Sequence, residues 1–305
     1  MFIEIAKTGR NNFWRYLVSI LIIILATQLI GGIPLFIIIT KGVLQTGSYS
    51  LPENPADFAA MGINPNLGMF AMLFPFIAGM VFMYICIRKI HERPFKSVLT
   101  SRPAFSWQRF WFGAGLWTLF QLISFIVHMV AEPGSYVFHA DWIAFIPLVI
   151  VSILFIPFQA GFEEVLFRGY LMQGFALLFR NKWLPLLITG MSFGLLHAFN
   201  PEVQAFGFWI AMPQYVGLGL FFGLLVICDE GLEIVLGIHI LNNIFLSLFL
   251  TTDSSALQTT ALFRAKVINP VTDLVELFLF IILFIFIAQR KYRWNIWQSV
   301  VSGIQ

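Results

Sequence analysis

Charged residues are scarce in this sequence, because Asp, Glu, Lys and Arg make up only 11% of its 305 residues. A soluble globular protein carries about 25% charged residues. Hydrophobic residues instead reach 59%, and they include 35 Phe and 9 Trp. This composition excludes an ordinary soluble domain and predicts an integral membrane protein whose solvent is lipid.

Cysteine is also rare, with only Cys86 and Cys228 in the chain. Two isolated thiols in apolar surroundings do not build a disulfide framework or a zinc–thiolate cluster, so we expect both to be free. The formal net charge of +3 does not indicate a nucleic-acid partner. In a membrane protein, Lys and Arg sort by side of the membrane and therefore report orientation.

Long apolar runs recur along the chain, and about 20 residues are needed to cross a hydrocarbon core of about 30 Å. The runs fall near residues 17–39, 68–87, 110–130, 142–160, 184–200, 206–228, 233–250 and 274–289. The first run is too long for the core of a signal peptide, which predicts an uncleaved first helix. We therefore expect an all-α fold, a single polytopic bundle of about eight transmembrane helices over residues 1–305.

An even number of spans places both termini on one side of the membrane. If that side is cytoplasmic, the inner segments hold 15 of the 18 Lys and Arg residues. The outer segments keep only Lys41, Arg264 and Lys266. This bias follows the positive-inside rule and predicts that both termini are cytoplasmic.

Three charged residues lie in the otherwise apolar stretch around the end of the fourth run, which reads FQAGFEEVLFRGY over residues 158–170. They are Glu163, Glu164 and Arg168. A charge near the middle of a membrane helix costs about 2.5–3.5 kcal/mol on insertion scales, so each needs a partner or a function. Glu164 and Arg168 are four residues apart and can form a salt bridge on one helical face. We expect this pair to be a scaffold that fixes helix position and local charge.

Two further apolar runs carry polar side chains. The fifth reads GMSFGLLH over residues 190–197, and its Gly190 and Gly194 allow a neighbouring helix to approach closely to the segment that ends in His197. The seventh reads GIHILNNI over residues 237–244 and places His239 and Asn243 on one helical face. Three spans therefore offer one polar cluster each.

The depth of these clusters in the bundle follows from the helical rise. If the chain turns near Asn181, Glu163 lies about 27 Å and His197 about 24 Å from that turn, along two antiparallel helices. We therefore expect Glu163 and His197 to face each other at similar depth.

His239 does not align in a uniform bundle, because it follows the turn near Glu230 by only about 13 Å. Two explanations are open. Either that turn is sunk into the protein, or Pro157 and Gly161 break the fourth helix and shift the glutamates.

A carboxylate beside a histidine in a partly dehydrated pocket can activate water as a general base. We assign the base to Glu163 and expect His197 to share the water or pass the proton onward. His239 and Asn243 would then donate to the oxyanion that develops on a scissile carbonyl. Asn242 points about 100° away from Asn243 on a helix, so we expect a packing or loop-facing amide there.

The order of these motifs resembles a known family. The patterns Glu163-Glu-x-x-x-Arg168, Phe193-x-x-x-His197 and His239-x-x-x-Asn243 look like the three motifs of the CPBP family. That family comprises the CAAX prenyl proteases of the Rce1 type and bacterial Abi proteins linked to bacteriocin processing and self-immunity. The motifs cover roughly a quarter of the chain, from 163 to 243, and we place the catalytic core at about residues 142–250.

The resemblance implies an eight-helix bundle with intramembrane endopeptidase activity. It implies that the first glutamate and the first motif histidine handle the water, and that the later His and Asn stabilise the oxyanion. Members of the family have often been labelled metalloproteases. Glu163, His197 and His239 could ligate zinc, since three protein ligands plus water make a catalytic zinc site. The chain has no His-Glu-x-x-His helix, however, and Arg168 beside the glutamates disfavours a divalent cation, so we expect a metal-free mechanism.

Three functional hypotheses are compatible with the sequence. The leading one is a bacterial-type intramembrane endopeptidase of the inner membrane, acting on a peptide or lipidated peptide such as a prenylated CAAX peptide, a bacteriocin leader or a membrane-anchored regulator. The second is a proton-coupled transporter, in which intramembrane Glu, Arg and His are equally natural. The third is a non-catalytic immunity or assembly protein that acts by binding. The sequence does not define an oligomeric state.

Overall fold

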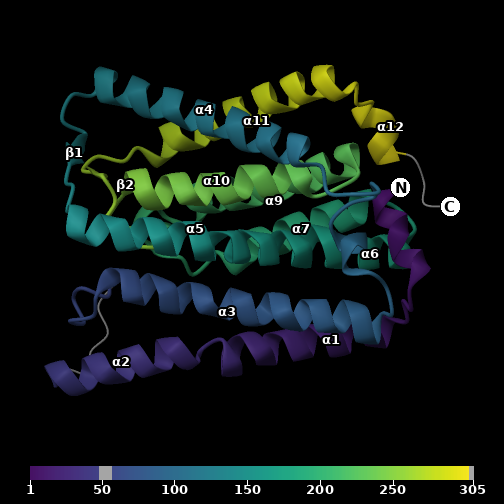
Figure 1. Ribbon diagram of the computed structural model, residues 1–305. Helices are drawn as coiled ribbons and strands as arrows, with labels where there is room; N and C mark the ends of the chain where they lie inside the picture. Colours follow the sequence, from purple (N-terminus) through teal and green to yellow (C-terminus); the bar gives the residue numbers. More distant parts are fainter. Residues whose placement is uncertain (48–56, 302–305) are drawn as a thin grey trace.

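The computed structural model describes residues 1–47 and 57–301, and its long helices run roughly along one axis (Figure 1). These helices are α1 (Phe13–Leu25), α2 (Ile33–Thr46), α3 (Pro65–Ile85), α4 (Trp107–Ala131), α5 (Trp142–Glu164), α7 (Trp183–Leu196), α9 (Phe208–Asp229), α10 (Glu233–Phe249) and α11 (Pro270–Tyr292). Short helices are α6 (Met172–Phe179), α8 (Pro201–Phe206) and α12 (Ile296–Val301). The expected all-α class is confirmed.

Tighter or wider helical turns connect several of these helices. The 3₁₀ segments are η1 (Phe2–Thr8) and η4 (Phe95–Val98), and the π-helical segments are η2 (Ala26–Ile30), η3 (Cys86–Ile90) and η5 (Val165–Leu171). The strands are β1 (Tyr136–Phe138), β2 (Leu250–Thr251) and β3 (Phe263–Ala265). They form a small sheet in the order β1-β3-β2 at the end of the bundle opposite η1 (Figure 1).

Each predicted span falls on an apolar helix. Six helical stretches of the described chain are long and apolar enough to cross a membrane: Phe13–Gln45, Pro65–Ile90, Trp107–Ala131, Trp142–Phe179, Phe208–Asp229 and Pro270–Tyr292. The fifth and seventh predicted spans correspond to α7 and α10, which are shorter apolar helices. The chain is therefore a polytopic helical membrane protein, with two of its apolar helices shorter than a full span.

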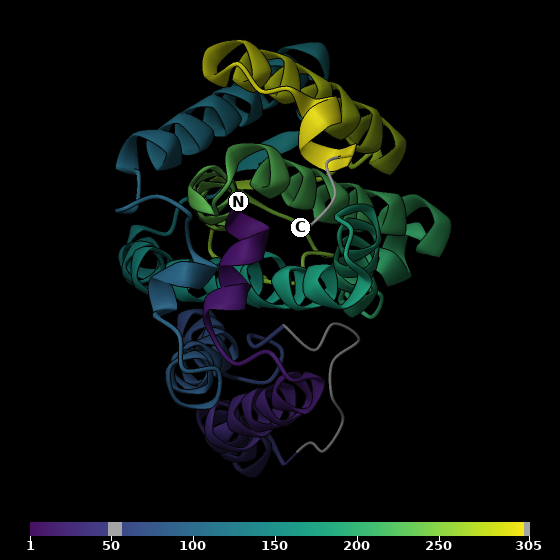
Figure 2. The same cartoon turned by 90° about the vertical axis from the view of Figure 1, so that its right-hand side faces the viewer.

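The bundle is layered when viewed along its axis (Figure 2). The group α1–α3 forms one side, α4 and α11 form the other, and α5, α7, α9 and α10 lie between them. Helix α10 packs against both α4 and α5, and α7 packs against α9. The helices that carry the polar motifs are thus the inner ones. The segments η1 and α12 lie at the same end of the bundle, as an even number of crossings requires (Figure 1).

The turn between α9 and α10 is sunk into the protein. The backbone N–H of Leu232 donates to the carbonyl of Leu99 at 2.8 Å, and Thr100 forms a β-bridge with Gly231. All residues from Gly231 to His239 are buried. Helix α5, in contrast, continues unbroken through Pro157 to Glu164. The first of the two explanations for the shallow position of His239 is therefore confirmed.

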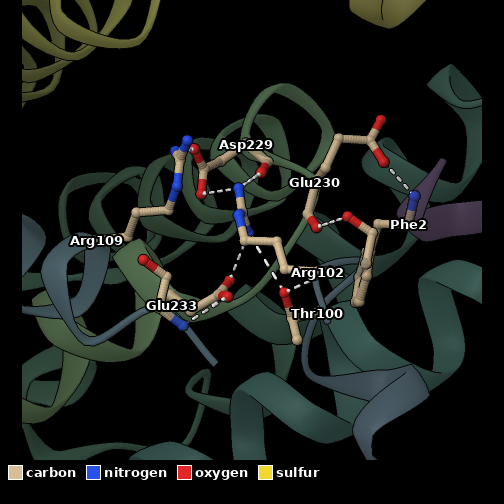
Figure 3. A network of polar contacts seen from close by, with 9 residues as sticks. Phe2, Thr100, Arg102, Arg109, Asp229, Glu230 and Glu233 are labelled. Atoms are coloured by element: carbon tan, nitrogen blue, oxygen red, sulfur yellow. Dashed lines mark hydrogen bonds and ion pairs between the residues drawn. The ribbon is translucent and has the colours of Figure 1, made fainter. Parts of the chain in front are cut away.

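An ionic network makes this sunken turn possible (Figure 3). Arg102 contacts Asp229 at 3.1 Å and Glu233 at 2.9 Å, and Arg109 forms a second ion pair with Asp229. Both carboxylate side chains are fully buried. A buried carboxylate without a partner is strongly destabilising, so the two arginines allow the turn to lie inside the protein. The backbone N–H of Phe2 also donates to the Glu230 carboxylate, which fastens η1 over the turn.

Glycines bring α7 and α9 into close contact, as the sequence predicted for Gly190 and Gly194. A Cβ atom on Gly194 would lie 2.5 Å from Val216, and one on Gly190 would lie 2.7 Å from Leu220. On the facing helix, a Cβ atom on Gly219 would lie 2.3 Å from the carbonyl oxygen of Gly190. No side chain fits at these positions unless the two backbones separate.

We expect Gly219→Ala to lower the free energy of unfolding by about 1–3 kcal/mol, because the methyl group forces α7 and α9 apart. Titration of the detergent-solubilised protein with SDS measures this change. Gly115→Ala on α4 is the matched control, since no atom lies within 4 Å of its added Cβ. Helix propensity predicts that the control is neutral or stabilised by up to about 1 kcal/mol. Equal stability of the two variants would contradict the packing described here.

Candidate functional site

The candidate site begins where α5 passes into the π-helical segment η5. Such π-helical turns inside α-helices are frequent at functional sites. Glu164 is the last residue of α5, and Arg168 lies in η5. The guanidinium Nη1 donates to Glu164 Oε1 at 2.8 Å, and both side chains are fully buried. The salt bridge predicted from their spacing is therefore present.

Arg168 also joins α5 to the two glycine-packed helices. Its Nη2 donates to the carbonyl of Gly219 on α9 at 3.0 Å. Its guanidinium carbon lies 4.4 Å from the ring centroid of Phe193 on α7. One buried cation thus fixes the relative positions of three helices, in agreement with the scaffold role expected for this pair.

His239 on α10 contacts the same Glu164 oxygen as Arg168. Its Nδ1 lies 2.8 Å from Glu164 Oε1. An ionised carboxylate only accepts hydrogen bonds, so we assign the ring hydrogen to Nδ1. In the neutral ring, Nε2 then carries the lone pair. This Nε2 lies 3.7 Å from Glu163 Oε2.

Glu163 has one oxygen that is held and one that is free of direct protein partners. Gln159 Nε2 donates to Glu163 Oε1 at 2.5 Å. Within the described part of the chain, Glu163 Oε2 is buried and has no hydrogen-bond partner. Its separation from His239 Nε2 is too long for a direct hydrogen bond.

Asn243 reaches Glu163 through an intermediate that sequence reasoning missed. Its Nδ2 donates to Gln159 Oε1 at 2.8 Å. An amide nitrogen carries two hydrogens, so a second donor of Asn243 is available for another acceptor. The sequence signal for Gln159 was its spacing, because it lies four residues before Glu163 and therefore on the same helical face.

Within the described residues, His197 forms no hydrogen bond or ion pair with Glu163, and the expectation that the two face each other at similar depth stays a prediction. His197 follows the last residue of α7, and its Nδ1 lies 2.8 Å from the carbonyl oxygen of Phe193. The Phe193 ring contacts both histidines, with centroid separations of 4.8 Å to His197 and 6.1 Å to His239. The sunken α9–α10 turn brings His239 to the depth of Glu163.

A second polar group surrounds His197 and was also missed. The ring of Tyr215 on α9 stacks on His197 with a centroid separation of 4.6 Å and an interplanar angle of 18°. The Tyr215 hydroxyl donates to Glu202 Oε2 at 3.3 Å and accepts from Asn200 at 3.2 Å. Burial raises the pKa of the Glu202 carboxyl above its usual range. No spacing in the sequence links these residues, because they lie on a loop, a short helix and α9.

The proposed zinc ligands do not form a ligand set as the side chains stand. No group of three or more His, Cys, Asp or Glu side chains in residues 1–47 and 57–301 is placed to hold a metal ion. His239 Nδ1 and Arg168 Nη1 both contact Oε1 of Glu164, which leaves His239 Nε2 as the ring nitrogen that faces Glu163. The metal-free mechanism stays a prediction. The zinc alternative with Glu163, His197 and His239 as ligands also stays a prediction.

A largely apolar recess of about 480 Å³ lies against the same helices that carry the site. Its lining includes Trp111 of α4, Pro157 and Gly161 of α5, and Leu236 and Ile240 of α10. On α10, Leu236 and Ile240 lie three to seven residues from Asn243 and share its side of the helix. A second recess of about 730 Å³ lies between α7, α9, α11 and α12. None of the six predicted site residues lines either recess.

We expect Arg168→Met to lower the free energy of unfolding by about 3–5 kcal/mol, because it leaves the buried Glu164 carboxylate without its cation. SDS titration in mixed micelles measures the loss. Arg10→Met is the control, since the Arg10–Glu92 pair is 58% and 48% exposed and is worth at most about 1 kcal/mol. A loss at Arg168 no larger than the loss at Arg10 would show that the buried pair does not hold the site.

Comparison with known protein families gives a match over the helices that carry the site. A family model described as type II CAAX prenyl endopeptidase Rce1-like matches residues 142–245. The match runs from the first residue of α5 into α10 and includes all six predicted site residues. No solved structure matches the chain.

A curated bacterial protein extends the similarity beyond these helices. The chain is 30% identical over 250 residues to an uncharacterized protein, YyaK, of Bacillus subtilis (strain 168), and the alignment covers 81% of each chain. The apolar helices and this relative together show an integral membrane protein of bacterial type. With its three motifs on α5–η5, α7 and α10, the chain belongs to the Rce1-like family of type II CAAX prenyl endopeptidases.

Proposed function

We propose that this protein is an intramembrane endopeptidase in which Glu163 and His239 hold and activate the attacking water. The observation that carries the proposal is the pair Glu163 Oε2 and His239 Nε2, two acceptor atoms 3.7 Å apart inside the helix bundle. A water that donates to both acceptors would lie beside the pair, with a small opening of the Glu163 and His239 side chains. Such a water is oriented for deprotonation by the carboxylate.

The reaction proceeds in two steps at the scissile amide. Glu163 takes a proton from the water as the oxygen of the water bonds to the carbonyl carbon, and the carbonyl π electrons move to its oxygen. The second N–H of the Asn243 amide donates to that oxyanion. When the intermediate collapses, the C–N bond breaks and the proton on Glu163 passes to the leaving nitrogen. One water is consumed and a carboxylic acid and an amine result.

His197 takes the second of the two roles expected from the sequence, the transfer of a proton. Its Nδ1 faces the Phe193 carbonyl, which only accepts, so Nε2 carries the lone pair in the neutral ring. We assign this Nε2 to proton exchange with the leaving amine or the product. The Phe193 ring lies between His197 and His239, which holds the water. Glu164 and Arg168 keep their role as scaffold.

A lipidated peptide is the substrate class that the surroundings of the site support best. The family description names a CAAX prenyl endopeptidase, which acts on peptides that carry a lipid near the cleaved bond. The 480 Å³ recess is lined almost wholly by apolar side chains, some of which belong to α5 and α10. A lipid tail seated in this recess would hold the attached peptide against the helices that carry the water site.

We expect Glu163→Gln to reduce cleavage by at least about 10²-fold, because the amide keeps the size of the side chain and cannot accept the proton. Release of fluorescence from a quenched, farnesylated peptide ending in a Cys-aliphatic-aliphatic-X sequence measures the rate in nanodiscs. Glu92→Gln, an exposed glutamate outside the bundle interior, is the control and should cleave at the wild-type rate. Wild-type activity in Glu163→Gln, or no cleavage by the wild type, would refute the proposal.

Chelation tests the metal-free mechanism separately. Because Arg168 already neutralises the carboxylate beside the water site, we expect dialysis against a strong chelator to leave the cleavage rate unchanged. Addition of zinc to the dialysed protein should not raise the rate. Loss of cleavage on dialysis and its recovery with zinc would show that the resting arrangement of side chains is not the active one.

A further inference from the structure

The orientation of the Asn243 amide is set by a run of hydrogen bonds that starts on another helix. A side-chain amide has a donor end and an acceptor end, and its orientation is assigned from its partners. An indole N–H and an ionised carboxylate have no such freedom, because the first only donates and the second only accepts. A series of amides between these two groups therefore has one consistent direction.

Helix α4 supplies the donor end of this series. Trp117 Nε1 donates to Asn242 Oδ1 at 3.0 Å, and Gln121 Nε2 donates to the same oxygen at 3.1 Å. The oxygen of Asn242 therefore faces α4, and its Nδ2 donates to Asn243 Oδ1 at 3.0 Å. Asn242 was expected to be a packing or loop-facing amide, but it instead links α4 to the motif residue beside it.

The series ends at the carboxylate that we assign as the base. Asn243 Nδ2 donates to Gln159 Oε1 at 2.8 Å, and Gln159 Nε2 donates to Glu163 Oε1 at 2.5 Å. Every hydrogen bond from Trp117 to Glu163 runs in the same direction. Reversing any one amide would place two donors or two acceptors against each other.

We propose that Trp117, Asn242 and Gln159 are positioning residues, which form a one-way hydrogen-bond chain that keeps Glu163 ionised and turns the donor end of Asn243 toward the site. Hereafter this series is called the amide chain. Its significance for catalysis rests on the proposed function, whereas its effect on the charge of Glu163 does not. Trp117 lies outside the residues matched by the family, 142–245, so the amide chain extends the site to α4.

The charges that face Glu163 come from other residues. His239 approaches from α10, and Glu164 and Arg168 lie on its own helical stretch. At the C-terminal end of α7, the titratable residue His197 contacts the Phe193 ring. The groups that α4 contributes to the amide chain are neutral. Substitutions of Trp117 and Gln121 therefore test the hydrogen bonds without changing a charge.

The experiment removes both donors of α4 with the double variant Trp117→Phe and Gln121→Leu. The Phe ring keeps the stacking of Trp117 on Phe221, which lies at a centroid separation of 5.7 Å. Infrared spectra of the reconstituted protein are recorded against pH, and the Glu163 carboxyl band is isolated by subtracting the spectra of Glu163→Gln. We expect its protonation midpoint to move to higher pH by about one unit, because the amides can then reverse and accept from a protonated Glu163.

Two controls separate the amide chain from general effects of substitution. Trp142→Phe changes an exposed tryptophan of α5 that lines neither recess and should leave the midpoint unchanged. In a Gln159→Leu background the chain is already cut, so the α4 double variant should add no further shift. A midpoint unchanged by the double variant, or a shift that persists with Gln159→Leu, would overturn the proposal. If the double variant does not fold, Asn242→Leu cuts the same chain and should give the same shift.

Cleavage of the farnesylated peptide supplies a second readout. Loss of the amide chain should lower kcat by about tenfold and leave KM unchanged, since the chain touches the base and not the substrate. A higher KM with unchanged kcat would contradict a positioning role. The infrared titration needs no substrate, so failure of the wild type to cleave any peptide would refute the proposed function alone.

Discussion

Glu164 accepts from Arg168 and from His239 with the same carboxylate oxygen, and both contacts measure 2.8 Å. Neither the glutamate nor the arginine is exposed, so each charge depends on the other for its stability. Arg168 also donates to the backbone carbonyl of Gly219 on α9, and His239 belongs to α10. The buried pair therefore connects α5 to both helices. The imidazole is thereby fixed with its second nitrogen beside Glu163. The chemistry we propose at that glutamate requires this anchor to be intact.

The sunken turn before α10 explains how a short helix can present a histidine at the right depth. Asp229 and Glu233 are buried at this turn and are neutralised by Arg102 and Arg109, which come from the segment before α4 and from α4 itself. Helix α4 thus contacts α10 and its turn in two places. Arg109 pairs with Asp229 at the turn, and the indole of Trp117 donates to Asn242 near the site. A membrane bundle can hold the two buried carboxylates of this turn because each is paired with an arginine.

The sequence predicted those features that depend on one helix or on helix-to-helix spacing of small residues. These include the apolar spans, the Glu164–Arg168 pair and the close approach at Gly190 and Gly194. It did not predict that His239 takes the place beside Glu163, because depth was measured from turns assumed to lie at the membrane surface. The π-helical segment η5 and the link from Trp117 to Asn242 were also missed. Such contacts depend on how helices are rotated and staggered, and residue periodicity carries little of that information.

The account requires Glu163 and His239 to act as one unit on a single water. A double-mutant cycle on the single-turnover cleavage rate tests this most directly, with Glu163→Gln, His239→Ala and the combined variant. The account predicts that the combined variant is no slower than the slower single variant, because either change alone already removes the oriented water. If the two losses multiply in the combined variant, the residues act independently and the shared-water mechanism is wrong.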